Sequence, residues 1–188
     1  MSQDLARWVA DLPTRHPVSG HTLNAEELAA ERIERSEFAQ KLEYFWRHRL
    51  PQTVELRDNT FVARPTFLGE LPALTCDFSH VSVLSLTGHD ALGIPAHFLE
   101  CFSGVQHLEL RNMALGRIPT AITDMPALSF LMLSRCGVVL GAEGQKLLAS
   151  LTRLKMLDLF DNPLGVAPDI SALKSLTFID FSNTDIDR

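Results

Sequence analysis

The stretch LKMLDLFDNPLGVAPDIS, residues 154–171, carries leucines at offsets 1, 4, 6 and 11 of a short pattern that begins at Leu154. Offsets 4 and 6 fall on one face of a strand, because side chains in a strand alternate between its two faces. Asn162 stands at offset 9, where a small polar side chain can satisfy backbone groups inside a turn. The stretch therefore predicts a short strand with one buried face, followed by a turn.

The same pattern recurs along the chain, in windows that begin at residues 81, 105, 128, 154 and 176. Nineteen of the twenty positions at these offsets are large and apolar. In a chain with 46% hydrophobic residues, twenty apolar matches have a chance probability of about 10⁻⁷. The steps of 24, 23, 26 and 22 residues fit the period of leucine-rich repeats. Because one such coil cannot bury its own leucines, the pattern predicts an α/β leucine-rich repeat solenoid with short parallel strands on its concave face.

The segments between the strands predict a mixed convex side. Pro95 and Pro119 each follow an isoleucine just after a strand, which favours an extended or single-turn connection. Residues 141–153 are long enough for a helix, with Leu147, Leu148 and Leu151 facing inward. Proline and glycine between residues 163 and 168 predict an irregular fourth connection.

The turn position at offset 9 varies from repeat to repeat. It is occupied in turn by His89, Met113, Cys136, Asn162 and Thr184. Cys136 and Asn162 suit a turn that needs a polar side chain, whereas Met113 does not. At Met113 the sequence therefore predicts a local rearrangement or a bridging water.

Residues 1–50 show no repeat and predict a helical N-terminal cap. Asn24 can cap a helix, with Glu27 in its third position, and that helix should run to about Arg49. Phe38, Leu42, Phe45 and Trp46 form one apolar stripe along it. Since the first coil of a solenoid has no neighbour on its outer side, this stripe is expected to cover it.

Residues 51–80 predict a degenerate first repeat. Thr60 and Val62 lie 24 residues before Leu84 and Leu86, and Leu71 continues the period. A rival frame uses Val54, Leu56 and Asn59, but it leaves 30 residues before the next strand. Residues 81–188 then make up five repeats, and we expect no C-terminal cap after them. The expected C-terminal edge is therefore open to a further domain, further repeats, a partner or a second copy of the chain.

The strand frame also predicts which side chains face solvent on the concave side. Offset 3 is mostly apolar and offset 5 is partly acidic, so an exposed apolar row should run beside charged groups. We take the following residues as candidate partner-binding residues: Val83, His107, Glu109, Arg111, Phe130, Met132, Arg135, Met156, Asp158, Phe160, Phe178 and Asp180. Aromatic residues and methionine are enriched in interface centres. The alternative is that the row only packs neighbouring strands together.

Charge and motifs exclude several classes of function. A net charge of −6 disfavours nonspecific binding to nucleic acid or to an anionic membrane. The chain has no apolar run long enough for a membrane span and no basic start typical of a signal peptide, which predicts synthesis in a cytosol. Four scattered histidines, at positions 80, 89, 97 and 107, do not have the spacing of a metal site. We expect no metal and no cofactor.

The three cysteines favour structural roles. Cys76, Cys101 and Cys136 lack the spacing of a disulfide framework, and we expect free thiols. His80 lies four residues after Cys76 and could lower the pKa of that thiol, which leaves a thiol-dependent transferase as a rival interpretation.

Longer phrases of the chain resemble a known family. They include FAQKLEYFWRHR at 38–49, DFSHV at 77–81, NPLG at 162–165 and SNTDI at 182–186. Over roughly residues 35–188 the chain is similar to the leucine-rich repeat region of bacterial dermonecrotic-toxin-like effector proteins. Many of these proteins end in an E3 ubiquitin ligase domain of the NEL ("novel E3 ligase") type.

The resemblance implies that the repeats select target proteins or restrain a ligase domain that lies downstream. It also implies synthesis in a bacterial cytoplasm, followed by secretion or translocation into a host cell. In that family the catalytic cysteine stands in a Cys-x-Asp motif, but Asp77 follows Cys76 directly and neither other cysteine has an aspartate nearby. No catalytic residue carries over, so we predict that this chain is not itself an enzyme. The alternative is a stand-alone or self-associating repeat scaffold without a link to ubiquitin.

Overall fold

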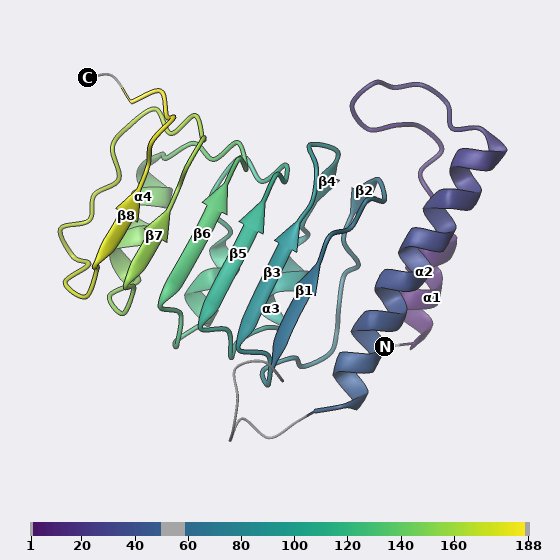
Figure 1. Cartoon of the computed structure of the whole chain (residues 1–188), viewed down its shortest axis with the longest axis horizontal. Coiled ribbons are helices and arrows are strands. Elements are labelled where there is room, and N and C mark those ends of the chain that lie inside the picture. The colour runs from purple at the N-terminus through teal and green to yellow at the C-terminus, as the bar shows by residue number, and fades with distance from the viewer. Residues whose placement is uncertain (1, 50–58, 187–188) are drawn as a thin grey trace.

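The computed structural model describes residues 2–49 and 59–186, and its centre is a six-stranded parallel sheet (Figure 1). The strands lie side by side in the order of the chain. They are β1 (Thr60–Ala63), β3 (Val83–Thr87), β5 (His107–Arg111), β6 (Phe130–Ser134), β7 (Met156–Asp158) and β8 (Phe178–Asp180). Two further strands, β2 (Gly69–Glu70) and β4 (Leu92–Gly93), pair with each other in a second sheet. The predicted mixed α/β architecture with short parallel strands is confirmed.

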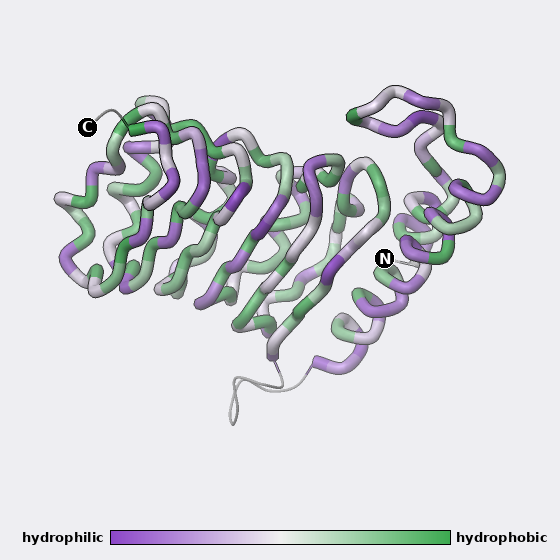
Figure 2. The backbone as a smooth tube through the Cα atoms, turned by 45° about the horizontal axis from the view of Figure 1, so that its top comes forward, coloured by the Kyte–Doolittle hydropathy of each residue, from purple (hydrophilic) through white to green (hydrophobic). Residues whose placement is uncertain are grey.

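The leucines of the repeat point into the core. Leu84 and Leu86 of β3 and Leu108 and Leu110 of β5 have no exposed surface, and the residues between them are half-buried. In Figure 2, hydrophobic and hydrophilic segments alternate along the chain. Full burial of one such side chain stabilises the fold by about 1.5–3 kcal/mol relative to exposure. The predicted inward positions within the strands of the repeats that begin at residues 81 and 105 are therefore confirmed, whereas Leu115 is only partly buried.

The first strand pairs one residue away from the predicted register. Phe61 lies opposite Leu84 and Ala63 opposite Leu86, so these two residues face the core. Thr60 and Val62, which were expected to face inward, lie on the other side of the sheet, and Val62 is 44% exposed. A one-residue slip exchanges the two faces of a strand. The step from β1 to β3 is thus 23 residues instead of 24. The rival frame's Val54 and Leu56 lie outside the described residues.

The connections on the far side of the sheet differ from one another. After Pro95 comes helix α3 (Ala96–Glu100), and after Pro119 comes the 3₁₀ helix η1 (Thr120–Asp124). The third connection contains α4 (Ala142–Ser150), and between β7 and β8 the chain is irregular. Of the three leucines expected to face inward from α4 and its end, Leu148 and Leu151 are buried, whereas Leu147 is only partly buried. The predicted kinds of connection are confirmed.

Asn162 holds the turn after β7 to the coil before it. Its Oδ1 accepts hydrogen bonds from the backbone amides of Cys136 at 2.9 Å and Val138 at 3.0 Å. Its Nδ2 donates to the carbonyl oxygens of Leu133, Leu159 and Phe160. The side chain is 2% exposed. Because buried backbone groups need partners, this one amide stabilises two adjacent turns.

The turn at Met113 is built differently, since a thioether is a poor substitute for an amide. Met113 is buried at 2% exposure, and a Cβ atom at Gly88 would lie 3.1 Å from its Cγ. The backbone instead bonds directly between coils, with the amide of Ala114 donating to the carbonyl of Leu92 at 3.1 Å. This arrangement is the local rearrangement predicted for Met113.

Two helices precede the sheet. Helix α1 (Ser2–Ala10) packs on α2 (Ala25–Arg47), and α2 runs beside the first strand (Figure 1). Asn24 and Glu27 form the predicted capping box, and His48 follows the last helical residue, so the helix ends two residues before the predicted Arg49. Phe38 of α2 meets Phe61 of β1 edge to face, with ring centroids 6.0 Å apart.

The contact between the helices and the sheet includes polar bonds. The ammonium group of Lys41 donates to the carbonyl oxygen of Val62 on β1. The guanidinium of Arg35, only 4% exposed, donates to the carbonyl oxygens of Trp8 at 2.8 Å and Leu68 at 3.0 Å. The carboxylate of Glu31 accepts from the amide of Leu68. Side chains of α2 thus join α1 to the segment that follows β1.

The coil around β8 is less buried than its predecessors. Phe181 is 39% exposed, whereas Leu159, its equivalent in the preceding coil, is fully buried. Ile179 lies opposite Leu157 in the ladder and is only partly buried. Within residues 59–186 no coil packs on the outer side of β8.

Candidate protein-binding face

The parallel register places the outward side chains of the sheet in columns. We call this solvent-facing side of the six strands the open face. One column, the apolar band, consists of Val83, His107, Phe130, Met156 and Phe178, which are register partners from strand to strand. Neighbouring members are about 4.8 Å apart, because that is the spacing of paired strands. The structure thus brings the predicted offset-3 residues into one row.

The apolar band is most exposed toward β8. Phe130 is 38% exposed and Phe178 is 50% exposed, whereas Val83 and Met156 are half-buried. The imidazole of His107 stacks on the ring of Phe130, with centroids 5.4 Å apart and planes inclined by 16°. An exposed row of mostly apolar side chains is a candidate interaction site.

A second column, the middle band, runs beside the first and contains Ser85, Glu109, Met132, Asp158 and Asp180. Each carboxylate is held by a neighbour. Glu109 pairs with Nε of Arg111 at 2.8 Å, and Asp158 accepts from the hydroxyl of Ser134 at 3.1 Å. The hydroxyl and amide of Ser182 both donate to Asp180 and lower the pKa of its carboxyl. These contacts fix the orientation of the three carboxylates.

The remaining predicted residues lie at the carboxyl ends of the strands but do not share one column. Arg111 is the last residue of β5 and pairs with Ser134, while Arg135 stands one position further on, in the turn. Arg135 has a left-handed backbone with φ of +55°, as do Asn112 and Asp161 at the same place in neighbouring coils. The guanidinium of Arg135 bonds to Asp161 at 2.9 Å and lies over the ring of Phe160.

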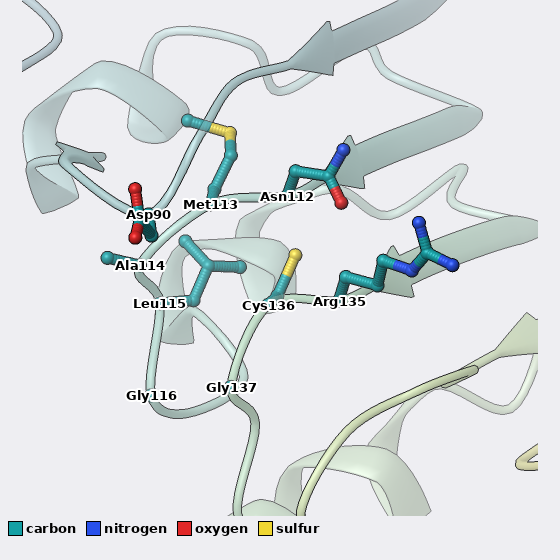
Figure 3. A pocket seen from close by; sticks show the side chains of 9 residues that line it. All are labelled: Asp90, Asn112, Met113, Ala114, Leu115, Gly116, Arg135, Cys136 and Gly137. Carbon is teal, nitrogen blue, oxygen red and sulfur yellow. The ribbon is translucent and has the colours of Figure 1, made fainter. Parts of the chain in front are cut away.

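A hollow of about 550 Å³ lies in the turns beyond β5 and β6 (Figure 3). Asn112, Met113 and Leu115 line it from one coil, and Arg135 and Cys136 belong to the next. Cys136 itself is fully buried, and this burial raises the pKa of its thiol to about 11. A neutral, inaccessible thiol is a poor nucleophile, so the Cys136 thiol is a poor candidate for a reactive group in this hollow.

Neither of the other cysteines has the surroundings of a catalytic thiol. Burial raises the pKa of the Cys101 thiol, which donates weakly to the carbonyl of His97. His80, the suggested activator of Cys76, instead bonds through Nε2 to the carbonyl of Phe45 at 3.0 Å. Burial also lowers the pKa of His80, which disfavours the imidazolium that would stabilise a thiolate. The described residues contain no cluster of metal-ligating side chains, and no described helix is long and apolar enough to cross a membrane.

Two surface features were not predicted from the repeat frame. Arg64 follows β1 and lines a hollow of about 500 Å³ on the open face together with Arg111 and Arg135. On the opposite side, Leu147, which packs against the core but is only partly buried, also lines a mainly apolar hollow of about 690 Å³ between η1 and α4. Arg64 was overlooked because its repeat is degenerate. The only available signal was its position 47 residues, or two periods, before Arg111.

Comparison with known proteins finds a likeness among solved structures. No family model matches the chain, and no curated protein matches it. A solved structure, the leucine-rich repeat ectodomain of the receptor kinase SOBIR1 from Arabidopsis thaliana, is similar over 67% of this chain and 70% of its own length. The sequence identity is 23% and the TM-score 0.47. The parallel sheet, the repeated buried leucines and the alternating connections give the chain an α/β fold of the leucine-rich repeat kind.

Proposed function

We propose that the chain is a protein-binding module that holds a partner on its open face. The observation that carries this proposal is the contiguous apolar band, whose exposed rings Phe130 and Phe178 lie beside fixed carboxylates. Interfaces combine aromatic anchors at their centre with polar and charged groups at their rim. The fold also suits the role, because leucine-rich repeats stack into curved surfaces that bind other proteins.

In this proposal the described strands form the concave side of a solenoid. Residues 1–50 are its helical N-terminal cap, and residues 51–80 are a degenerate first coil. Residues 81–188 supply five repeats that present the open face. The packing of Phe38 on Phe61 and the bond from Lys41 to the edge of β1 support the capping role of α2.

The partner's biological setting follows from the resemblance to NEL-type effectors. We infer that the chain is the target-recognition region of such an effector, which is made in a bacterial cytoplasm and delivered into a host cell. The size of the native polypeptide tests this inference, by immunoblotting the source cells with an antibody raised against this segment. A band far above 20.9 kDa supports a larger ligase that carries its catalytic cysteine elsewhere. A band near 20.9 kDa contradicts it and favours the alternative, a scaffold that self-associates through the partly exposed coil of β8.

Binding itself is tested with a double substitution on the open face. Phe130→Asp combined with Phe178→Asp should abolish partner binding in a pull-down or calorimetric titration, because it places charge where rings must be desolvated. The circular dichroism spectrum should not change, since both rings face solvent. Val166→Asp is the matched control, because Val166 is 47% exposed but lies in the irregular connection after β7. A partner that binds the double variant as tightly as the unaltered protein would place the interface elsewhere.

A further inference from the structure

Three arginines from separate repeats surround one hollow on the open face. Arg64 follows β1, Arg111 ends β5 and Arg135 follows β6, and all three are exposed. The hollow between them measures about 500 Å³, and its lining contains one carboxylate, that of Asp158. The lining residues therefore carry three positive charges and one negative charge, and two of the arginines are also paired with carboxylates outside the lining.

In two of these arginines, the Nε atom contacts a carboxylate. Glu109 contacts Nε of Arg111 at 2.8 Å, and Asp161 contacts Nε of Arg135 at 2.9 Å. The sulfur of Met132 lies 3.2 Å from the Arg111 Nε as well. The terminal nitrogens of both guanidinium groups donate no hydrogen bond to any residue that the structure describes. Each guanidinium is thus oriented from one side and keeps its two-nitrogen end for an incoming anion.

Hydrogen bonds from the protein already engage one oxygen of the Asp158 carboxylate in the lining. Oδ1 of Asp158 accepts from the Ser134 hydroxyl at 3.1 Å and from the backbone amide of Phe160 at 2.9 Å. These bonds hold Asp158 in place against the strand ends. The hollow also offers neutral polar side chains, those of Thr87 and Asn112. An anion that enters would meet two pre-oriented guanidinium groups, a third nearby, and neutral donors.

We propose that this hollow binds the carboxylates of an acidic segment in the partner protein that lies on the open face. This proposal rests on the proposed function and adds the chemistry of the partner. The arginines come from strands β1, β5 and β6 of the order β1-β3-β5-β6, so they spread over about 14 Å. Such a spread suits several single carboxylates along a chain better than one compact anion. The same partner would place apolar side chains on the neighbouring apolar band.

The experiment measures binding of a fluorescently labelled hexaglutamate peptide to the full chain at low salt, by fluorescence anisotropy. We expect saturable binding that weakens as salt rises, because exposed ion pairs are screened. Replacing both Arg111 and Arg135 with glutamine should weaken binding about tenfold, and Arg64→Gln should weaken it by a smaller factor. The matched control, Arg117→Gln with Arg153→Gln, removes two exposed arginines on the opposite side and should change affinity less than about twofold.

A second readout does not depend on whether the variants fold. In the unaltered protein, the arginine Nε–Hε signals in ¹H–¹⁵N spectra should shift selectively for Arg111 and Arg135 when the peptide is added. Absence of saturable binding, or an equal loss in the control variant, would overturn the proposal.

Failure of this proposal is distinguishable from failure of the proposed function, because hexaglutamate has no apolar side chain. Phe130→Ala with Phe178→Ala should leave peptide binding unchanged but should weaken binding of the natural partner. If hexaglutamate binds at the arginines while the natural partner tolerates the aromatic substitutions, the role proposed for the apolar band is wrong and the anion-binding hollow stands.

Discussion

Replacing Asn162 with alanine should cost a large share of the stability of the fold. Asn162 is 2% exposed, and its Oδ1 accepts from the amides of Cys136 and Val138. Neither amide has another acceptor among the described residues, and both residues are fully buried. Alanine would leave two buried N–H groups unsatisfied.

Each orphaned group costs about 1–3 kcal/mol. Two such groups, both buried, predict a loss of about 3–4 kcal/mol. That loss compares with a total stability of about 5–15 kcal/mol for a typical domain. The carbonyl oxygens of Leu133, Leu159 and Phe160 would also lose the Asn162 Nδ2 donor. The expected loss of stability is therefore larger than the minimum for two unsatisfied amides.

The assay is urea unfolding followed by circular dichroism at 222 nm. With a denaturant slope of about 2.5 kcal/mol per molar, the midpoint should fall by about 1.5 M while the slope stays constant. Thr184→Ala is the matched control, because Thr184 occupies the same position in the next coil and makes one bond, to the carbonyl of Phe181. Its expected loss is below about 1 kcal/mol. A midpoint shift for Asn162→Ala no larger than that of the control would refute the argument that this amide sustains the turns.

Three further outcomes are expected. Leu157→Asp should unfold the sheet, since it places a carboxylate at a site with no exposed surface, and loss of the circular dichroism signal would report it. Cys136 should resist a thiol reagent at pH 8 until denaturant is added, whereas the partly exposed Cys76 reacts in the folded chain; rapid labelling of Cys136 would contradict its burial and raised pKa. Burial lowers the pKa of His80 below 6.5, so the unfolded chain binds a proton first and stability falls as pH drops below about 6.5. His80→Gln should make the urea midpoint less sensitive to pH in that window, because an amide can still donate to the carbonyl of Phe45, and an unchanged pH profile would argue against this linkage.

The repeat frame predicted which residues of the main coils are buried, because the alternation of side chains along a strand depends only on neighbouring residues. Leu108 and Leu110 must face one side of a strand whatever precedes or follows them, and stacking of equal periods then aligns the strands. The start of α2 could also be predicted from nearby residues alone. Asn24 and Glu27 bond to each other's backbone across one turn, so the four residues involved are sufficient to specify it.

The register of β1 could not be obtained in the same way. Counting 24 residues back from Leu84 selects Thr60, but the structure pairs Leu84 with Phe61. The choice depends on Phe38 and Phe45 of α2, whose rings lie 6.0 Å and 5.1 Å from that of Phe61. A large ring between the helix and the sheet buries more apolar surface than Thr60 would, and periodicity contains no information on that contact.

The sequence by itself determined the period, the buried leucines, the kinds of connection and the apolar band, because each depends on residues within one coil or on equal spacing between coils. Only the tertiary structure decided the register of β1 and the meeting of Arg64 with Arg111 and Arg135. Those three arginines are up to 71 positions apart, and two of them stand in different columns of the frame. Their common hollow exists because parallel stacking places the carboxyl ends of successive strands at one edge of the sheet, about 4.8 Å apart.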